Sequence, residues 1–457
     1  MNQMRETIAA ISTASTAAAV GMVRISGKDA LLVADKIFKA QSKKSLCESK
    51  GYRAHYGNVY DSEGEFDTAV ALVFRAPKSY TGEDACEITV HGGLYITKRL
   101  LRAALENGAR LAEAGEFTKR AFQNGKMSLS QAEAVTSLIS ARGKEEAKAA
   151  LAVSEGRLNR ESEDIRSKLI TLLGEISAYC DYPDEDIVDV SRETLLKTLK
   201  IILARLDALL EGFDKGRVIS EGVDTAIVGS PNVGKSTIMN LLSGYEKSIV
   251  TDIAGTTRDI VEDTVRVGDF TLRLSDTAGI RNTQDVVEAV GVERAKKRMQ
   301  SAALVLAVFD ASRKLNDEDL KLIEETKSAN CIAIINKGDL ESKIDDSKIK
   351  AAFERVVYLS AKSGQGKDEF CAAIEDALSE YKLSPDALIL INERQYDCAQ
   401  RARKEVADAL FGAKEGQMPD MLGILLEEAL RALSELSGES TTEAVVNEIF
   451  SKFCVGK

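Results

Sequence analysis

The chain has 457 residues, of which 44% are hydrophobic and 29% charged, a composition typical of a soluble globular protein of about three domains. The formal net charge of −11 excludes a global basic field for nucleic acid, so any contact with RNA needs a local patch or a partner. There is no run of about 18 apolar residues, which excludes a transmembrane helix. The first twenty residues are too polar for a signal peptide, and none of the seven cysteines forms a C-x-x-C pair. We therefore expect a cytoplasmic protein without a disulfide framework, a zinc ribbon or contact with a membrane.

Residues 1–118 are expected to form an α+β domain. The apolar runs 19–25 and 69–74 and the alternating run 86–90 predict strands. After a His-Gly-Gly turn, the pattern of residues 94–105 predicts a helix.

The rest of the chain predicts a helical domain that an α/β domain interrupts. In 119–221 and again in 383–457, apolar residues recur at three- and four-residue spacing. Ser384 followed by Pro385 predicts the start of the second helical segment. In 222–382, short apolar runs alternate with amphipathic segments, which is typical of βαβ units and a mainly parallel sheet. The two helical segments are expected to pack together, because each has an apolar face that needs a partner.

The strongest motif is the segment Gly229–Ser236, GSPNVGKS, which matches the P-loop pattern G-x-x-x-x-G-K-[ST]. It follows a predicted strand and precedes a predicted helix at 237–242, and this context disfavours a chance glycine-rich turn. The backbone amides of such a loop surround phosphate at a helix N-terminus. Lys235 would reach the β- and γ-phosphates, and Ser236 would bind Mg²⁺.

Three weaker motifs follow in order, each at the end of a predicted strand: Asp276–Gly279, Asn336–Asp339 and Ser360–Lys362. The first, D-T-A-G, would hold Mg²⁺ through water and contact the γ-phosphate. The second, N-K-G-D, ends in a carboxylate that accepts hydrogen bonds from guanine N1–H and the 2-amino group. Adenine offers neither donor, so the set predicts a GTP-binding domain over a P-loop kinase or ATPase.

The group that activates water is left open by these motifs. Ile280 stands where Ras-like GTPases carry a glutamine, and isoleucine cannot polarise water. The candidates are Asp285, Glu288, Glu293 or a group from a partner. No arginine finger is evident, and a bound monovalent cation could replace it.

Several further segments resemble the family of bacterial tRNA-modification GTPases called MnmE or TrmE. The similarity covers essentially the whole chain, and its one departure, at Met127-Ser128, touches no functional residue of the family. It is carried by the segments VRISG at 23–27, SYTGED at 79–84, HGG at 91–93, GEFTKRAFQNGK at 115–126, TDIAGTTRD at 251–259 and FCVGK at 453–457.

The resemblance implies an activity and partners. Members of the family hydrolyse GTP and, with an FAD-dependent partner called MnmG or GidA, modify C5 of the wobble uridine of certain tRNAs. The product carries a carboxymethylaminomethyl or aminomethyl group, and a tetrahydrofolate derivative (5,10-methylene or 5-formyl form) supplies the one-carbon unit. We expect a homodimer through the N-terminal folate-binding domain, and a heterotetramer with the partner.

The resemblance also implies roles for individual residues. Mg²⁺ is expected at Ser236 and Thr257, and Glu288 matches the family's water-activating glutamate. K⁺ is expected at Asn232, Thr251, Ile253 and Thr256. Folate is expected at Arg24, Glu87, Lys126 and Lys457. GTP is expected to contact Asn232, Val233, Gly234, Lys235, Ser236, Thr237, Thr251, Asp252, Ile253, Ala254, Gly255, Thr256, Thr257, Asp276, Thr277, Ala278, Gly279, Asn336, Lys337, Asp339, Ser360, Ala361 and Lys362.

Cys454 lies three residues before Lys457 and is the second expected catalytic residue. Val446, Phe450 and Phe453 share one face of a predicted helix, which would dock the tail and fix the cysteine. Ser440 to Glu443 matches a capping box at the start of that helix. The thiol is either a nucleophile or a proton-transfer group, and a packed tail cysteine is the plain alternative.

Two other functions are weighed. A regulatory or ribosome-assembly GTPase shares the GTP motifs and should lack a folate site and the FCVGK tail. A scaffold with a vestigial nucleotide site is disfavoured because Lys235, Ser236, Thr257 and Asp276 are intact. The sequence does not tell which tRNAs are modified, whether glycine or ammonium is incorporated, or how tightly the partner binds.

Overall fold

The computed structural model describes residues 6–141, 143–181, 192–243, 263–276, 302–382 and 388–456. Contacts between Cα atoms divide the chain into two compact units. Unit 1 is Met1–Thr136 with Ser162–Arg166 and Leu430–Lys457, and unit 2 is Ser137–Glu161 with Ser167–Ala429. The domain boundaries at 118, 221 and 383 stay predictions. Within the described ranges, no helix has both the length and the apolar character needed to cross a membrane.

Unit 1 is built on a seven-stranded sheet with the strand order β3-β4-β5-β6-β2-β1-β7. Neighbouring strands are antiparallel except for the β1–β7 pair, which is parallel. The strands predicted at 19–25, 69–74 and 86–90 are confirmed as β2, β5 and β6. The strands are β1 (Ile8–Ile11), β2 (Val20–Ser26), β3 (Phe38–Ala40), β4 (Arg53–Asp61), β5 (Gly64–Phe74), β6 (Ala85–His91) and β7 (Arg110–Leu111).

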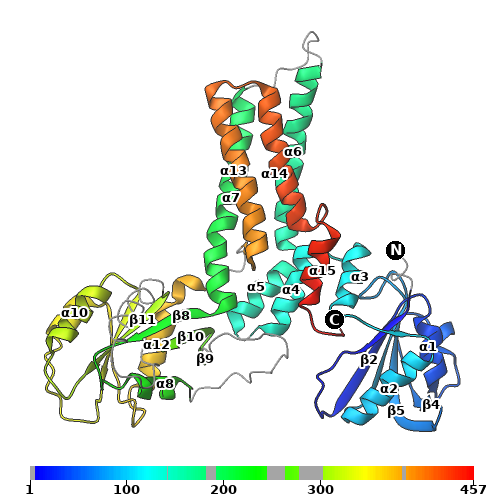
Figure 1. Cartoon of the computed structure of the whole chain (residues 1–457), viewed down its shortest axis with the longest axis horizontal. Helices are drawn as coiled ribbons and strands as arrows, with labels where there is room; N and C mark the ends of the chain where they lie inside the picture. The colour runs from blue at the N-terminus through cyan, green and yellow to red at the C-terminus, as the bar shows by residue number, and fades with distance from the viewer. Residues whose placement is uncertain are drawn as a thin grey trace, which may run out of the picture. The chain divides into compact units, whose positions relative to one another are not determined.

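Two helices, α1 (Ala30–Ile37) and α2 (Leu94–Glu106), pack with one face of this sheet, and α2 confirms the helix predicted at 94–105 (Figure 1). The shared core contains Val23, Ile88 and Leu100, all fully buried. Successive residues of a strand point to opposite faces. Arg24 and Glu87, which alternate with these core residues, therefore lie on the other face of the sheet.

A smaller apolar cluster joins the C-terminal helix of unit 1 to the segment after the sheet. Here α15 (Glu443–Ser451) lies beside α3 (Glu116–Gln123) and the start of α4 (Leu129–Ser140). The predicted apolar face is confirmed, because Val446, Phe450 and Phe453 are buried together with Leu129 and Ala132. The predicted capping box is wrong: the helix begins at Glu443, and the N-cap residue Thr442 makes no side-chain cap hydrogen bond.

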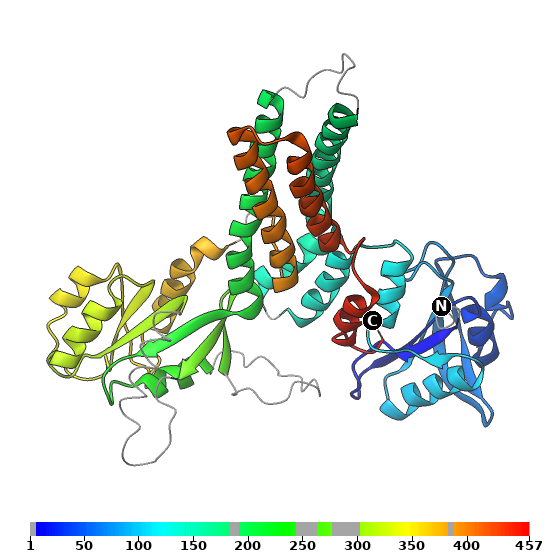
Figure 2. The same ribbon diagram turned by 45° about the horizontal axis from the view of Figure 1, so that its top comes forward.

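The helices of unit 2 come from both sides of its α/β part. Figures 1 and 2 show the helices α7 (Arg192–Glu221) and α13 (Glu393–Glu415) side by side. Between them the rings of Phe213 and Tyr396 stack, with their centroids 4.3 Å apart. The predicted packing of the two helical segments is thereby confirmed. Of the longer helices, α5 (Lys144–Ser154), α7 and α13 lie wholly in unit 2, while α6 (Arg157–Asp181) and α14 (Pro419–Ser437) have residues in both units.

The predicted start of the second helical segment at Pro385 is wrong. Residues 383–387 lie outside the described ranges, but residues 388–392 are described and are not helical. The helix begins at Glu393, because the side chain of Asn392 accepts a hydrogen bond from the amide of Gln395 and caps it.

The α/β part of unit 2 is a six-stranded sheet with the order β13-β12-β11-β8-β10-β9, parallel except for the β9–β10 pair. This confirms the predicted, mainly parallel sheet. Apolar side chains of β8, β11 and β12 enter clusters on both faces of the sheet. The strands are β8 (Val223–Val228), β9 (Asp263–Val267), β10 (Phe270–Asp276), β11 (Leu304–Asp310), β12 (Cys331–Asn336) and β13 (Arg355–Tyr358). The helices are α8 (Lys235–Ser243), α10 (Asp317–Thr326), α11 (Ser347–Ala352) and α12 (Lys367–Ala377), and short 3₁₀ turns lie at Leu46–Glu48 in unit 1 and Ser379–Tyr381 in unit 2.

Candidate functional site

The P-loop connects the end of β8 to the start of α8, as predicted. Its backbone needs glycine: Gly234 has φ 101°, and a Cβ there would lie 2.3 Å from Nδ2 of Asn336. The Lys235 ammonium donates hydrogen bonds to the carbonyl oxygens of Gly229 at 2.7 Å and Ser230 at 3.0 Å. Lys235 therefore lies against the loop whose amides surround phosphate in proteins of this class.

The P-loop is joined directly to the two motifs that follow β12 and β13. Asn336 Nδ2 donates to the carbonyl oxygen of Val233 at 2.9 Å, and its Oδ1 accepts from the amide of Ala361 at 3.0 Å. The carboxyl ends of parallel strands meet at one edge of the sheet. One asparagine thus holds three separate loops together at that edge.

Asp339 is exposed and carries the carboxylate expected to select guanine. Its Oδ1 accepts a hydrogen bond from Ser360 Oγ at 2.6 Å, and this bond lowers the pKa of Asp339 below its ordinary value. The carboxylate is therefore ionised at neutral pH, as a contact with guanine N–H groups requires. Lys337 beside it forms a 2.6 Å ion pair with Asp310 at the end of β11.

A buried carboxylate behind the P-loop was missed from the sequence. Asp319 is 1% exposed and accepts hydrogen bonds from Ser230 Oγ at 2.8 Å and from Arg313 Nη1 at 2.6 Å. Burial opposes its ionisation, but the bonds from Arg313, the Asn316 amide and Ser230 outweigh burial and lower the pKa of Asp319. The sequence feature that could have pointed to Asp319 is its spacing of three residues from Asn316, because these two residues form a capping box at the start of α10.

Part of the predicted nucleotide site lies outside the described residues. Asp276 ends β10 as predicted. The outside residues are Thr251 to Thr257, Thr277, Ala278, Gly279 and Glu288, together with Lys457 of the predicted folate set.

Unit 1 carries a second polar site on the sheet face opposite α1 and α2. The β2–β6 register places Arg24 opposite Glu87. Nε and Nη2 of Arg24 both contact Oε1 of Glu87, at 2.9 and 2.8 Å, and the side chains are 12% and 19% exposed. The rings of Tyr80 and Phe117 lie 5.3 and 5.6 Å from the guanidinium carbon. Arg24 is therefore fixed by a carboxylate and by two aromatic rings.

The C-terminal tail lies beside Arg24. The carbonyl oxygen of Gly456 accepts hydrogen bonds from Arg24 Nη1 at 3.4 Å and from Ser12 Oγ at 3.1 Å. The amide of Gly115 donates to the carbonyl oxygen of Cys454 at 3.3 Å. Gly456 has φ 99°, and a Cβ there would lie 2.3 Å from the carbonyl oxygen of Ile11. The tail can therefore lie against β1 only with glycine at this position.

The remaining predicted residues of this site occupy different positions. Lys126 does not contact Arg24: its Nζ donates to the carbonyl oxygen of Pro77 at 2.9 Å, in the loop that carries Tyr80. Cys454 is an exposed residue, whereas Cys86 is buried in the same unit and burial raises the pKa of its thiol. The structure thus joins Arg24 to the tail directly, Glu87 to the tail through Arg24, and Lys126 to the loop that carries Tyr80.

The parallel strands, the P-loop after β8 and the N-K-G-D motif at the end of β12 define a GTP-hydrolysing enzyme of the P-loop class. Comparison with known proteins narrows this class. The model of the MnmE helical domain matches residues 129–454, and that of the GTP-binding protein TrmE N-terminus matches residues 7–126.

Full-length relatives agree with the family models. A protein of Clostridioides difficile (strain 630) named tRNA modification GTPase MnmE is 39% identical over 455 residues, which are 99% of each chain. The protein of the same name from Bacillus licheniformis is 40% identical over 458 residues, 99% of this chain and 100% of the relative. Among solved structures, the FeoB G-domain from Methanococcus jannaschii is 27% identical and covers 34% of this chain and 97% of that chain, with a TM-score of 0.26. The chain belongs to the MnmE (TrmE) family.

Proposed function

We propose that this GTPase modifies C5 of the wobble uridine of certain tRNAs, together with an FAD-dependent partner of the MnmG or GidA kind in a heterotetramer. The product would carry a carboxymethylaminomethyl or aminomethyl group. The observation that carries the proposal is that a guanine-nucleotide site and the Arg24–Glu87 site beside the Cys454 tail occur in one chain. The name of its relatives, tRNA modification GTPase, supports tRNA as the substrate.

The Arg24–Glu87 site fits a tetrahydrofolate derivative. Both bonds from Arg24 go to Oε1 of Glu87, and no described residue is hydrogen-bonded to Oε2. A carboxylate oxygen so placed suits the adjacent N–H donors of a 2-amino-4-oxopteridine, by the chemistry through which Asp339 suits guanine. Lys126 and Lys457 would meet the carboxylates of the glutamate tail. When bound, the 5,10-methylene or 5-formyl form supplies the one-carbon unit.

The P-loop side chains fit the ions that the resemblance implies, because hydroxyl and amide oxygens suit Mg²⁺ and K⁺. Ser236 and Thr257 would hold Mg²⁺, while Asn232, Thr251, Ile253 and Thr256 would hold K⁺. Asn232 is exposed with φ 64°. The two ions would offset charge on the phosphates, and Glu288 would orient the attacking water. We expect GTP hydrolysis to be faster in K⁺ than in Na⁺ at equal ionic strength, and equal rates would contradict this cation site.

Cys454 is proposed to act on the uracil ring. Uracil C5 is a poor nucleophile, and a thiolate that adds at C6 makes C5 enolate-like. Cys454 is exposed, and the tail is held by a hydrogen bond from Gly115 to the carbonyl oxygen of Cys454 and by one from Arg24 to that of Gly456. Proton transfer to or from the base is the alternative role for the same group.

A homodimer through unit 1 is also proposed. The cross-strand register places Tyr56, Val70, Thr89 and Met22 on one face of the sheet, opposite α1 and α2. Tyr56 is 53% and Val70 42% exposed in the single chain. Burial against a second copy would remove this apolar surface from water.

Nucleoside analysis of tRNA from cells that lack the gene tests the function. We expect the modified wobble uridine to disappear and to return when the wild-type gene is restored. Binding of 5-formyltetrahydrofolate to the purified chain is the second measurement. Normal nucleosides and no folate binding would favour a regulatory or ribosome-assembly GTPase.

A further inference from the structure

The loop between β5 and β6, residues 75–84, contacts two of the proposed folate residues. The ring of Tyr80 lies over Arg24, and the carbonyl oxygen of Pro77 accepts from Lys126. The hydroxyl groups of Tyr80 and Thr118 are hydrogen-bonded at 2.9 Å, which ties the ring to α3. The position of this loop therefore sets where Arg24 and Lys126 lie.

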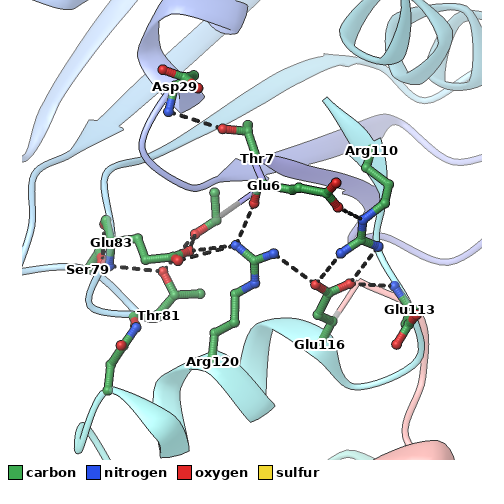
Figure 3. Close-up of polar contacts among 12 residues, drawn as sticks. Glu6, Thr7, Asp29, Ser79, Thr81, Glu83, Arg110, Glu113, Glu116 and Arg120 are labelled. Atoms are coloured by element: carbon green, nitrogen blue, oxygen red, sulfur yellow. Dashed lines mark hydrogen bonds and ion pairs between the residues drawn. The ribbon is translucent and has the colours of Figure 1, made fainter. Parts of the chain in front are cut away.

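A buried guanidinium holds the loop from its inner side (Figure 3). The side chain of Arg120, in α3, is 4% exposed. Its Nη1 donates to the backbone carbonyl oxygen of Glu6 at 2.9 Å and to both carboxylate oxygens of Glu83 at 3.2 Å. Its Nη2 donates to Glu116 Oε1 at 2.8 Å. One side chain thus joins the start of β1, the loop and α3.

Glu83 connects Arg120 to strand β2 and, through Ser26, to another residue of the loop. Its Oε2 accepts from Ser26 Oγ at 2.8 Å, and the hydroxyl groups of Ser26 and Thr81 are hydrogen-bonded at 2.7 Å. The side chain of Asn124 donates to the carbonyl oxygen of Thr81 at 2.7 Å. Ser26 and Thr81 are fully or almost fully buried, so water does not compete for these bonds.

The charges of the network alternate in sign. Glu116 lies between Arg110, at 2.6 Å, and Arg120, at 2.8 Å. Burial opposes the ionisation of Glu116, but bonds from Arg110, the Glu113 amide and Arg120 outweigh burial and lower its pKa. A buried ionic network contributes little net stability compared with apolar packing of the same volume. What it provides is a fixed geometry, because a planar guanidinium accepts only a few arrangements of its partners.

We propose that Arg120 and Glu83 are positioning residues for the folate site. They fix the loop 75–84, and through Tyr80 and Pro77 they fix Arg24 and Lys126 before a ligand arrives. Preorganisation of this kind raises affinity because binding no longer has to order the loop. This inference rests on the proposed function, and neither residue belongs to the set proposed to contact folate.

The first test is affinity for 5-formyltetrahydrofolate, measured by calorimetry on the full chain. Arg120→Lys keeps the charge, but one ammonium cannot bridge three acceptors in a plane. Glu83→Gln keeps the shape and removes the charge. We expect each variant to weaken binding about tenfold or more, the effect of losing one charge-assisted hydrogen bond. Arg120→Met should weaken binding further than Arg120→Lys, while GTP hydrolysis stays at the wild-type rate in all three.

Arg99→Lys is the matched control. Arg99 of α2 binds Asp61 of β4 through two bonds of 2.5 and 2.9 Å, with side chains 19% and 11% exposed. Like Arg120 it joins two segments of unit 1 through carboxylates, although it is more exposed, and its ion pairs among the described residues are with Asp61 and Glu63, outside the loop 75–84. Its substitution should leave folate affinity within about twofold of the wild-type value, whatever it does to the melting temperature. Equal losses in Arg99→Lys and Arg120→Lys would mean that the network acts only through general stability, and would overturn the inference.

Hydrogen–deuterium exchange of the ligand-free chain gives a readout that does not depend on folate. We expect faster exchange in peptides from 75–84 in Arg120→Lys and Glu83→Gln, and no change there in Arg99→Lys. Unchanged exchange in the loop would overturn the inference even if affinity fell. If the wild-type chain bound no folate, the proposed cofactor would be wrong, and loop exchange alone would decide whether Arg120 and Glu83 position the loop.

Discussion

The nucleotide site of unit 2 and the Arg24–Glu87 site of unit 1 differ in how far apart along the chain their residues lie. The residues of the second site are the more widely separated. In the nucleotide site, Asn336 reaches the P-loop across 103 residues, and the P-loop, the Asn336–Asp339 motif and the Ser360–Lys362 motif each lie at the end of a parallel strand of one sheet. In the second site, Arg24 meets Glu87 across 63 residues and Gly456 across 432. Its parts come from two strands, a loop, a helix and the end of the chain.

This difference separates two ways of building a binding site. At the nucleotide site, sheet topology alone brings consecutive loops to one edge, so short motifs suffice. At the second site, strand register, aromatic packing around Arg24 and docking of α15 must all be correct together. We therefore expect a substitution in the nucleotide site to change either nucleotide binding or hydrolysis. A substitution near Arg24 should disturb several contacts of the second site at once.

The largest expected effect separates the two sites completely. Cys454→Ser should abolish the wobble modification in cells, because a hydroxyl group is a far weaker nucleophile than a thiolate at neutral pH. GTP hydrolysis and its response to K⁺ should stay near wild type. Nucleoside analysis and phosphate release measure the two activities, with Cys180→Ser, at an exposed cysteine of unit 2, as control. Normal modified-nucleoside levels would reduce Cys454 to a packing role.

Glu288→Ala should affect chemistry at the nucleotide site and spare binding. We expect hydrolysis to fall about 100-fold or more, the usual contribution of a positioned acid or base. Nucleotide affinity, measured with a fluorescent GTP analogue, should change little. An equal loss of affinity would make the residue structural, and unchanged hydrolysis would transfer its role to Asp285, Glu293 or a partner.

Asp339→Asn should affect recognition at the nucleotide site and spare the second site. Loss of the carboxylate removes two acceptors for guanine N–H groups, and we expect GTP affinity to fall about thirtyfold or more. Xanthosine triphosphate should bind the variant more tightly than it binds the wild-type chain. Its C2 oxygen can accept a hydrogen bond from the side-chain amide introduced at position 339, at the place where guanine donates one. Asp345→Asn, at another exposed carboxylate of the same unit, should change neither affinity. A full preference for GTP in Asp339→Asn would contradict the assignment.

The smallest expected effect concerns acid stability. The pKa of Glu116 is lowered in the folded chain, so the unfolded chain binds this proton more tightly. Its contribution to stability is therefore complete above the ordinary glutamate pKa of 4.5 and is lost as pH falls through the lower folded value. Glu116→Gln should destabilise unit 1 at pH 7 and narrow the difference in melting temperature between pH 7 and pH 3.5. Glu63→Gln, at a carboxylate that is 76% exposed, should narrow this difference in melting temperature less. Equal narrowing in the two variants would contradict the contribution assigned to Glu116.

Local patterns predicted some element positions and missed others. The helix at 94–105 and the strands at 19–25, 69–74 and 86–90 were found, since periodicity and flanking turns agree there. The starts proposed at Ser440 and Pro385 were wrong, although both carried plausible cap chemistry. At Glu393 the cap is the side chain of Asn392, which accepts a hydrogen bond from the amide of Gln395, and at Glu443 the first buried helical residue is Val446.

By itself the sequence determined the class of the nucleotide-binding domain, through the P-loop, and the alternation of helical and α/β segments. Gly229–Ser236 and Asn336–Asp339 predict their own surroundings, because each motif works only at the end of a strand in a parallel sheet. The tertiary structure decided the rest. No local pattern states that Arg24 pairs with Glu87, that Gly456 lies beside them, or that Arg120 joins three segments. These contacts follow from strand register and from docking of the tail, which depend on the packing of residues hundreds of positions apart.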